Sequence, residues 1–261
     1  MPAVLKIATW NVNSIKVRLG HVLDYLRSAT PDVLLLQETK VPEDQFPRLE
    51  IEALGYRAAA IGQRGYNGAA ILSKLPMSDV ARGLPGFEDE QARYIEATIA
   101  DLRIASLYLP NGNPIDSDKF TYKLDWMRAF RNHVRSLLAL DQAFVLGGDY
   151  NVAPEDIDVF DPATMAEDAV CRPEARALFR EVIYLGVTEA FRTLHPDLTQ
   201  AYSYYDYQAG AWEKGRGIRI DHLLLSPTVA DRLVQVGIDR AQRGLKQPSD
   251  HVPVWCELEG V

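Results

Sequence analysis

Short runs of β-branched and aliphatic residues recur along the chain, with polar segments between them. Runs of this length and composition are typical of buried β-strands. In a few longer segments apolar residues repeat at intervals of three and four, as in a helix that buries one face. The pattern predicts strands over Leu5–Trp10, Val33–Gln37, Ala69–Ser73, Tyr94–Ile99, Arg103–Leu109, Ala143–Leu146, Ile218–Leu225 and Val252–Leu258, and helices over Val17–Ser28, Lys123–Leu140 and Pro173–Leu185.

The order of these segments limits the fold. Several predicted strands follow one another without a helix between them, which does not fit a purely parallel array of alternating strands and helices. No linker rich in proline, glycine or serine and no fixed-period repeat interrupts the chain. We therefore expect an α/β fold, with mixed sheets covered by outer helices, in one continuous domain over residues 1–261.

Polar side chains stand at the ends of most predicted strands. In "FVLGGDYNVAP" the strand is followed at once by Asp149 and Asn151. Residues two apart in an extended chain point the same way, so a carboxylate and a carboxamide emerge side by side. Because such ends recur along the chain, we expect them to converge on one site. The other ends carry Asn11 and Asn13, Glu38, Tyr108 and Asn111, Asp221, and Asp250 with His251.

The carboxylates among these residues indicate a cation. Glu38, Asp149, Asp221 and Asp250 would repel one another if they met without one. Oxygen ligands with Asn11 beside them suit a hard ion, so we expect Mg²⁺, with Mn²⁺ as a substitute. The two cysteines form no zinc-binding spacing with a histidine.

Composition adds limits on partners and compartment. The net charge of −8 counts against a general nucleic-acid clamp, but not against an enzyme that meets phosphates at one local basic surface. No apolar stretch approaches the roughly 20 residues that span a bilayer, and no basic and apolar leader opens the sequence. These features predict a cytoplasmic protein that does not associate with membranes.

Aromatic and cationic residues interleave in one stretch, "YSYYDYQAGAWEKGRGIRID". Tyr204, Tyr205 and Trp212 lie close in sequence to Arg216 and Arg219. Stacking surfaces beside cations suit contacts with nucleotides and phosphates. The alternative is a tyrosine-rich strand edge with no role in binding. We expect substrate contacts from Trp212 and Arg219.

Six segments, in order, resemble the successive motifs of the exonuclease III family of abasic-site endonucleases, within the endonuclease/exonuclease/phosphatase superfamily that includes deoxyribonuclease I. They read "ATWNVNSI", "LLLQETK", "LYLPNG", "GGDYNVAP", "IRIDHLLLS" and "PSDHVPV", and the resemblance runs from about Lys6 to Trp255. It implies a four-layer α/β sandwich, in which two packed mixed β-sheets are flanked by helices. It also implies a Mg²⁺-dependent DNA-repair phosphodiesterase that acts as a monomer. Such an enzyme incises duplex DNA 5′ to abasic sites and also has 3′→5′ exonuclease and 3′-end cleaning activity.

The resemblance implies a role for each polar strand end. Glu38 would be the principal metal ligand, supported by Asn11, Asn13 and Asp250. Asp149 would activate the attacking water.

The remaining polar residues would act on the phosphate. Asn151 would orient the water or the phosphate, and His251, itself oriented by Asp221, would stabilise the phosphoryl oxygens. Tyr108 and Asn111 would hold the phosphate or the leaving oxygen.

The resemblance also extends to substrate recognition. Lys119 would lie near a DNA phosphate. Tyr204, Tyr205 and Ile218 would help to form a small apolar pocket for a flipped-out sugar without a base. Asn111 and Tyr204 depart from the bacterial exonuclease III pattern, which leaves open the balance among abasic-site incision, 3′→5′ exonuclease and 3′-phosphate removal.

Two other functions compete with this one. A superfamily relative would hydrolyse another phosphoester, such as RNA, an inositol phosphate or a lipid head group. A catalytically inactive DNA-binding or scaffold protein would be expected to lack at least one carboxylate or the histidine, yet all of them are present.

Overall fold

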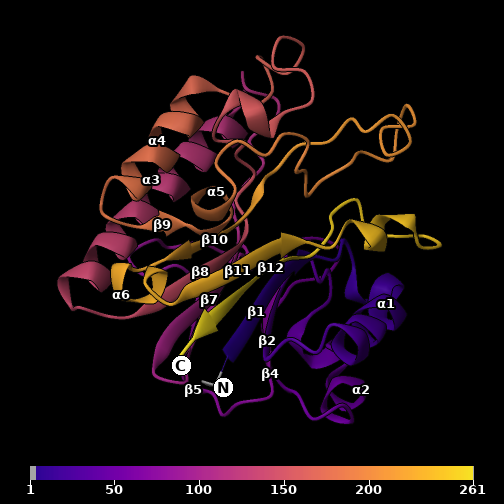
Figure 1. Cartoon of the computed structure of the whole chain (residues 1–261), viewed down its shortest axis with the longest axis vertical. Coiled ribbons are helices and arrows are strands. Elements are labelled where there is room, and N and C mark those ends of the chain that lie inside the picture. Colours follow the sequence, from indigo (N-terminus) through magenta and orange to yellow (C-terminus); the bar gives the residue numbers. More distant parts are fainter. Residues whose placement is uncertain (1–3, 261) are drawn as a thin grey trace.

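The structure, a computed structural model, describes residues 4–260, which form two six-stranded sheets with helices on their outer faces (Figure 1). Sheet A has the order β11-β12-β1-β2-β4-β3, and sheet B has the order β5-β6-β7-β8-β10-β9. The strands of sheet A are β1 (Val4–Asn11), β2 (Val33–Gln37), β3 (Arg57–Ile61), β4 (Ala69–Ser73), β11 (Leu233–Ile238) and β12 (Val254–Glu259). Those of sheet B are β5 (Ser78–Arg82), β6 (Tyr94–Ile99), β7 (Leu102–Tyr108), β8 (Phe144–Asp149), β9 (Thr188–Glu189) and β10 (Asp221–Leu225).

Each sheet has one parallel pair at its centre. In sheet A, β1 pairs with β2, and in sheet B, β7 pairs with β8, while the other pairs are antiparallel. Parallel neighbours need a crossover connection, which α1 (Ile15–Ser28) and α3 (Asp118–Ala139) provide. The other helices are α2 (Arg48–Glu52), α4 (Pro173–Ile183), α5 (Ala190–Leu194) and α6 (Pro227–Ala230), with 3₁₀ turns at Glu43–Gln45, Asp156–Asp158 and Arg240–Gly244.

Three apolar clusters hold these layers together. One lies between the sheets, where Leu35 and Ile71 of sheet A face Val145 and Leu223 of sheet B. A second packs α3 and α4 on the outer face of sheet B, and a third packs α1 and α2 on the outer face of sheet A. The order helix, sheet, sheet, helix confirms the expected four-layer sandwich, and Figure 1 shows the two helical layers on opposite sides.

The predicted elements are all present, with shifts at their ends. The largest shift concerns α3, which begins at Asp118 rather than at Lys123. β10 begins at Asp221, because Ile218 makes only isolated bridges to Val159 and Tyr204. The pattern missed the short or exposed elements, namely β3, β5, β9, β11, α2, α5 and α6. β5 and β11 carry many exposed residues and so lack the apolar run that marks a buried strand. Within residues 4–260, every helix is too short or too polar to cross a membrane.

Candidate active site

The polar strand ends meet at one edge of the two sheets, where they surround a hollow of about 460 Å³ that we call the catalytic hollow. The carboxyl ends of parallel strands share an edge, so the central pairs β1–β2 and β7–β8 deliver their polar ends to the same place. The loop before β12 adds the last of them. Predicted residues that line the hollow are Glu38, Tyr108, Asn111, Asp149, Asn151, Tyr204, Ile218, Asp250 and His251.

A glycine explains how β8 reaches this place. A Cβ on Gly147 would lie 2.6 Å from Leu35 Cδ1 of sheet A and 2.7 Å from Leu223 Cδ2 of sheet B. Any side chain there would force the sheets apart where they meet the hollow. With glycine, β8 packs closely against sheet A, and Asp149 comes into register beside Tyr108.

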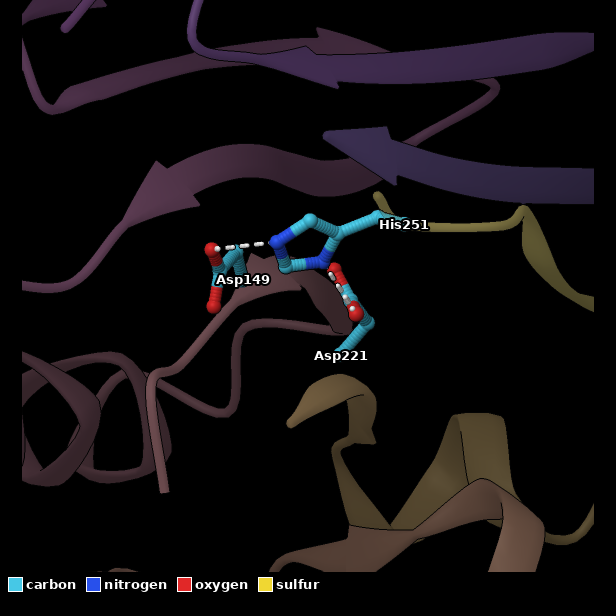
Figure 2. Close-up of side chains that lie close together, drawn as sticks. All are labelled: Asp149, Asp221 and His251. Carbon is cyan, nitrogen blue, oxygen red and sulfur yellow. Dashed lines mark hydrogen bonds and ion pairs between the residues drawn. The ribbon is translucent and has the colours of Figure 1, made fainter. Parts of the chain in front are cut away.

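His251 lies between two buried carboxylates (Figure 2). Its Nδ1 is 2.8 Å from Asp221 Oδ2, and its Nε2 is 3.6 Å from Asp149 Oδ2. Burial alone would lower the pKa of His251, but the charges of Asp221 and Asp149 outweigh burial and raise that pKa to about 10. The imidazole is therefore a cation at neutral pH. These three side chains are close enough to hold a metal, with ligand atoms within 4.8 Å of one another.

Asp149 is almost fully buried, and both of its carboxylate oxygens accept hydrogen bonds. Asn11 Nδ2 donates to its Oδ2 at 2.9 Å, and the Asn151 backbone N–H donates to its Oδ1 at 2.9 Å. Burial raises the pKa of Asp149 to about 7, against the lowering effect of the His251 charge. A carboxylate with a pKa near neutrality is suited to accept a proton from water.

Asn11 lies beside two of the carboxylates and turns its amide nitrogen toward them. Its Oδ1 accepts from the Asn13 backbone N–H at 3.0 Å, and an N–H can only donate. The amide nitrogen must therefore face the carboxylates, where it also donates to Glu38 Oε1 at 2.8 Å. Asn13 likewise donates from Nδ2 to Asp250 Oδ1 at 3.1 Å. Both asparagines hold carboxylates in place.

Glu38 carries an ion pair that the strand pattern did not predict. Lys40 Nζ lies 2.8 Å from Glu38 Oε2. Burial alone would raise the pKa of Glu38, but Lys40 and Asn11 hold it below its usual value. Both Glu38 (φ 51°) and Lys40 (φ 56°) have left-handed backbone, which costs energy for such residues and is concentrated at functional sites. The sequence signal was present, because Lys40 ends the motif "LLLQETK".

Tyr108 lies half-buried on the wall of the hollow. Burial and the nearby carboxylates of Glu38 and Asp149 raise its pKa well above the usual value. Its phenol is therefore a hydrogen-bond donor at neutral pH. Arg93 fixes this tyrosine, with its guanidinium 4.8 Å from the ring centre and its Nη1 donating to the Tyr108 carbonyl at 3.2 Å.

A buried lysine, also unpredicted, joins the two loops that carry Asn111 and Asn151. Lys123 Nζ donates to the Asn111 carbonyl at 2.9 Å and to the Asn151 carbonyl at 2.6 Å. The two asparagine side chains are bonded to each other at 2.9 Å. Gly112 makes room for the lysine, since a Cβ there would lie 2.7 Å from Lys123 Cδ. The helical spacing contained the signal, because Lys123 falls on the buried face of α3 with Trp126.

Four predicted substrate contacts lie outside the catalytic hollow. Lys119 is exposed in the first turn of α3. Tyr205 is fully buried and packs edge-to-face on Trp212, with ring centres 4.8 Å apart. Arg219 was expected to reach a DNA phosphate, which the structure contradicts. It is fully buried, and its Nε and Nη1 each lie 2.8 Å from a carboxylate, those of Asp158 and Glu189.

Fold and site together define the class of protein, a hydrolase of phosphoester bonds. Comparison with known proteins then gives the family. The sequence profile of the endonuclease/exonuclease/phosphatase family matches residues 8–251. Exodeoxyribonuclease III of Haemophilus influenzae is 31% identical over 267 residues, which cover 98% of this chain and 100% of that protein. The chain belongs to the endonuclease/exonuclease/phosphatase family.

Solved structures agree with this assignment. A 3′ phosphatase from Neisseria, bound to a product DNA hairpin, is 39% identical with a TM-score of 0.95, and the match covers 98% of this chain and 99% of that one. An AP endonuclease from Archaeoglobus fulgidus is 38% identical with a TM-score of 0.93, and the match covers 98% of this chain and 100% of that one.

Proposed function

We propose that the chain is a Mg²⁺-dependent DNA-repair phosphodiesterase. It incises duplex DNA on the 5′ side of abasic sites and also acts on 3′ ends, releasing nucleotides and 3′ phosphates. The observation that carries this proposal is the buried Asp149 beside the His251–Asp221 pair, in the same hollow as Glu38. Relatives named as an exodeoxyribonuclease, a 3′ phosphatase and an AP endonuclease support the substrate.

The side chains suggest how the reaction proceeds. Asp149 takes a proton from the water whose oxygen bonds to phosphorus. The His251 cation and the amides of Asn111 and Asn151 stabilise the extra charge on the phosphoryl oxygens. The bond from phosphorus to the 3′ oxygen then breaks, and Tyr108, a protonated phenol, is placed to donate to that leaving oxygen.

The donor set of the hollow fits Mg²⁺. Glu38 and Asp250 offer carboxylate oxygens to it, and among the described lining residues there is no cysteine. Glu38 already accepts a cation, the Lys40 ammonium. Magnesium bound there would neutralise charge on the phosphate and on the leaving oxygen.

The proposal includes a single catalytic domain over residues 1–261 that acts as a monomer; the lining of the catalytic hollow comes from positions 38 to 251, nearly the whole chain, which supports one domain. The presence of the complete set also disfavours an inactive scaffold. Relatives that act on DNA favour this substrate over RNA, inositol phosphates or lipid head groups.

The direct test uses two labelled duplexes, one with a single abasic-site analogue and one with an undamaged recessed 3′ end. We expect incision 5′ to the lesion and shortening of the recessed strand in Mg²⁺, and neither in EDTA. Restoration by Mn²⁺ after EDTA treatment would support the oxygen-ligand site. An enzyme that leaves both duplexes intact in either metal would contradict the proposal.

A further inference from the structure

A second hollow of about 310 Å³ adjoins the catalytic hollow. The two have common walls, formed by Met165, Tyr204, Asp206 and Ile218. A molecule held at the catalytic residues and reaching past Tyr204 and Ile218 would therefore enter the second hollow. This volume is at the lower end of the range of ligand pockets in proteins.

The walls of the second hollow are apolar with a polar rim. Phe160, Met165, Tyr204 and Ile218 offer flat or aliphatic surfaces, and Ala209 and Ala211 are too small to fill the space between them. Asp206, Gln208 and Arg216 supply polar groups. Flat apolar walls with a few hydrogen-bonding groups suit a nucleobase, which stacks through its faces and bonds through its edges.

Arg216 is available to contact a base in the second hollow. Its side chain is exposed, and within the part of the chain that the structure describes it forms no ion pair. By contrast Arg219, three residues further on, is buried and paired with Asp158 and Glu189. A guanidinium can stack on a base or donate to its acceptor atoms.

Among the three proposed reactions, only removal of a terminal nucleotide would place a base in the second hollow. In abasic-site incision and in removal of a terminal nucleotide, water bonds to the same kind of phosphorus and the bond to the preceding 3′ oxygen breaks. The nucleotide unit attached through its 5′ oxygen to that phosphorus has a sugar in both reactions. It has a base only when a terminal nucleotide is removed. In removal of a 3′ phosphate, this unit is absent altogether.

We propose that the second hollow, lined by Phe160, Met165, Ala209, Ala211 and Arg216 beyond Tyr204 and Ile218, is a base pocket for the terminal nucleotide during 3′→5′ exonuclease action. This inference rests on the proposed function, because the catalytic hollow must cut DNA for the base pocket to matter. It makes the intact 3′ nucleotide, with its base, a substrate that the enzyme is built to accept.

The test fills the pocket without touching the catalytic residues. Ala209 is exposed on the rim, so Ala209→Phe adds a ring to the pocket, and Ala209→Ser is the matched control. Because Ala209 has left-handed backbone (φ 55°), the thermal unfolding of both variants is compared with that of wild type first. Each variant is assayed on three duplexes, with a recessed 3′ end, an internal abasic-site analogue and a 3′ phosphate. We expect kcat/KM for the recessed end to fall roughly 5- to 150-fold in Ala209→Phe, the loss that corresponds to stacking of one base. The other two activities, which place no base in the pocket, should stay within about twofold of wild type, the change expected when no transition-state contact is lost.

The outcomes separate the two proposals. If the wild-type enzyme cuts none of the three duplexes, the proposed function itself is wrong. If the wild-type enzyme cuts them and Ala209→Phe lowers all three activities equally, or lowers none, the base pocket is wrong and the proposed function stands. A Phe160→Ala variant, which removes one wall, should also lose activity selectively on the recessed end.

Discussion

Replacing Arg219 with methionine tests whether this arginine supports the fold or contacts DNA. Its guanidinium is fully buried between Asp158 and Glu189. Burial alone would raise the pKa of Glu189, but Arg219 is the main cause that lowers it to about 2. Removing the cation therefore leaves two buried carboxylates short of a partner.

The expected loss of stability depends on the interactions that Asp158 and Glu189 keep without Arg219. Removing one partner of a buried ion pair typically costs about 3–5 kcal/mol. Here Asp158 keeps a second ion pair to Arg192, and Glu189 keeps a hydrogen bond of 2.7 Å from the Arg192 backbone N–H. We therefore expect the free energy of unfolding to fall by about 3 kcal/mol, the lower end of this range. For a chain of this size, such a loss lowers Tm by roughly 6–12 °C.

The assay combines thermal unfolding with the salt dependence of DNA cleavage. Arg232→Met is the matched control, since Arg232 is exposed and forms no ion pair within residues 4–260. In Arg219→Met we expect a lower Tm and an unchanged slope of log(kcat/KM) against log salt. If Arg219 instead contacted a DNA phosphate, the variant would have the same Tm as the control, and its slope of log(kcat/KM) against log salt would be smaller by about one. That second result would refute the structural role.

Three further predictions follow from the site and the core. Asp149→Asn should lower kcat by about 10²–10⁴-fold while leaving the unfolding curve near that of wild type, and near-normal turnover would rule out Asp149 as the base. Lys123→Met should lower kcat by up to about 10²-fold, because the loops of Asn111 and Asn151 lose their common anchor; steady-state kinetics with an unchanged kcat would count against this role. Burial would raise the pKa of Glu96, but hydrogen bonds from His133, Arg103 and Tyr94 outweigh it and lower that pKa to about 2 from 4.5. A lowered pKa stabilises the fold above pH 4.5, so urea titrations of wild type should show about 3 kcal/mol lost as the pH falls from 4.5 towards 2, whereas Glu96→Gln should lack this part of the slope.

Much of the site was predictable because it stands at strand ends. The apolar runs before Glu38 and Asp149 defined the strands, and a polar residue directly after a buried strand has few places to lie other than the sheet edge. Alternation along an extended chain predicted that Asp149 and Asn151 lie together, and they do, but through a turn: β8 ends at Asp149, Asn151 has left-handed backbone, and its N–H donates to Asp149 Oδ1. The two-sheet sandwich came from the resemblance, and the structure confirms it.

The parts that were not predictable depend on partners far away in sequence. Arg219 was assigned with its basic neighbours, but its partners Asp158 and Glu189 lie 61 and 30 residues away. Its position between Ile218 and Ile220, which both line the hollow, already placed it on the opposite side of the extended chain. Lys123 begins a predicted helix, and only the fold shows that two loops place their carbonyls around its ammonium group.

The pairing of β1 with β12 bears on how the protein is synthesised. Val4 lies opposite Glu259, so one edge of β1 stays open until β12 has been synthesised. A nascent chain that stops before residue 240 has neither Asp250 nor His251, and it exposes β1 as an unpaired edge. Such a fragment lacks two residues of the proposed site and has an open strand edge, the kind of surface that makes incomplete chains prone to aggregation. The strand that completes sheet A thus follows directly on the segment that supplies Asp250 and His251, so closing the edge of β1 and completing the proposed site depend on the same part of the chain.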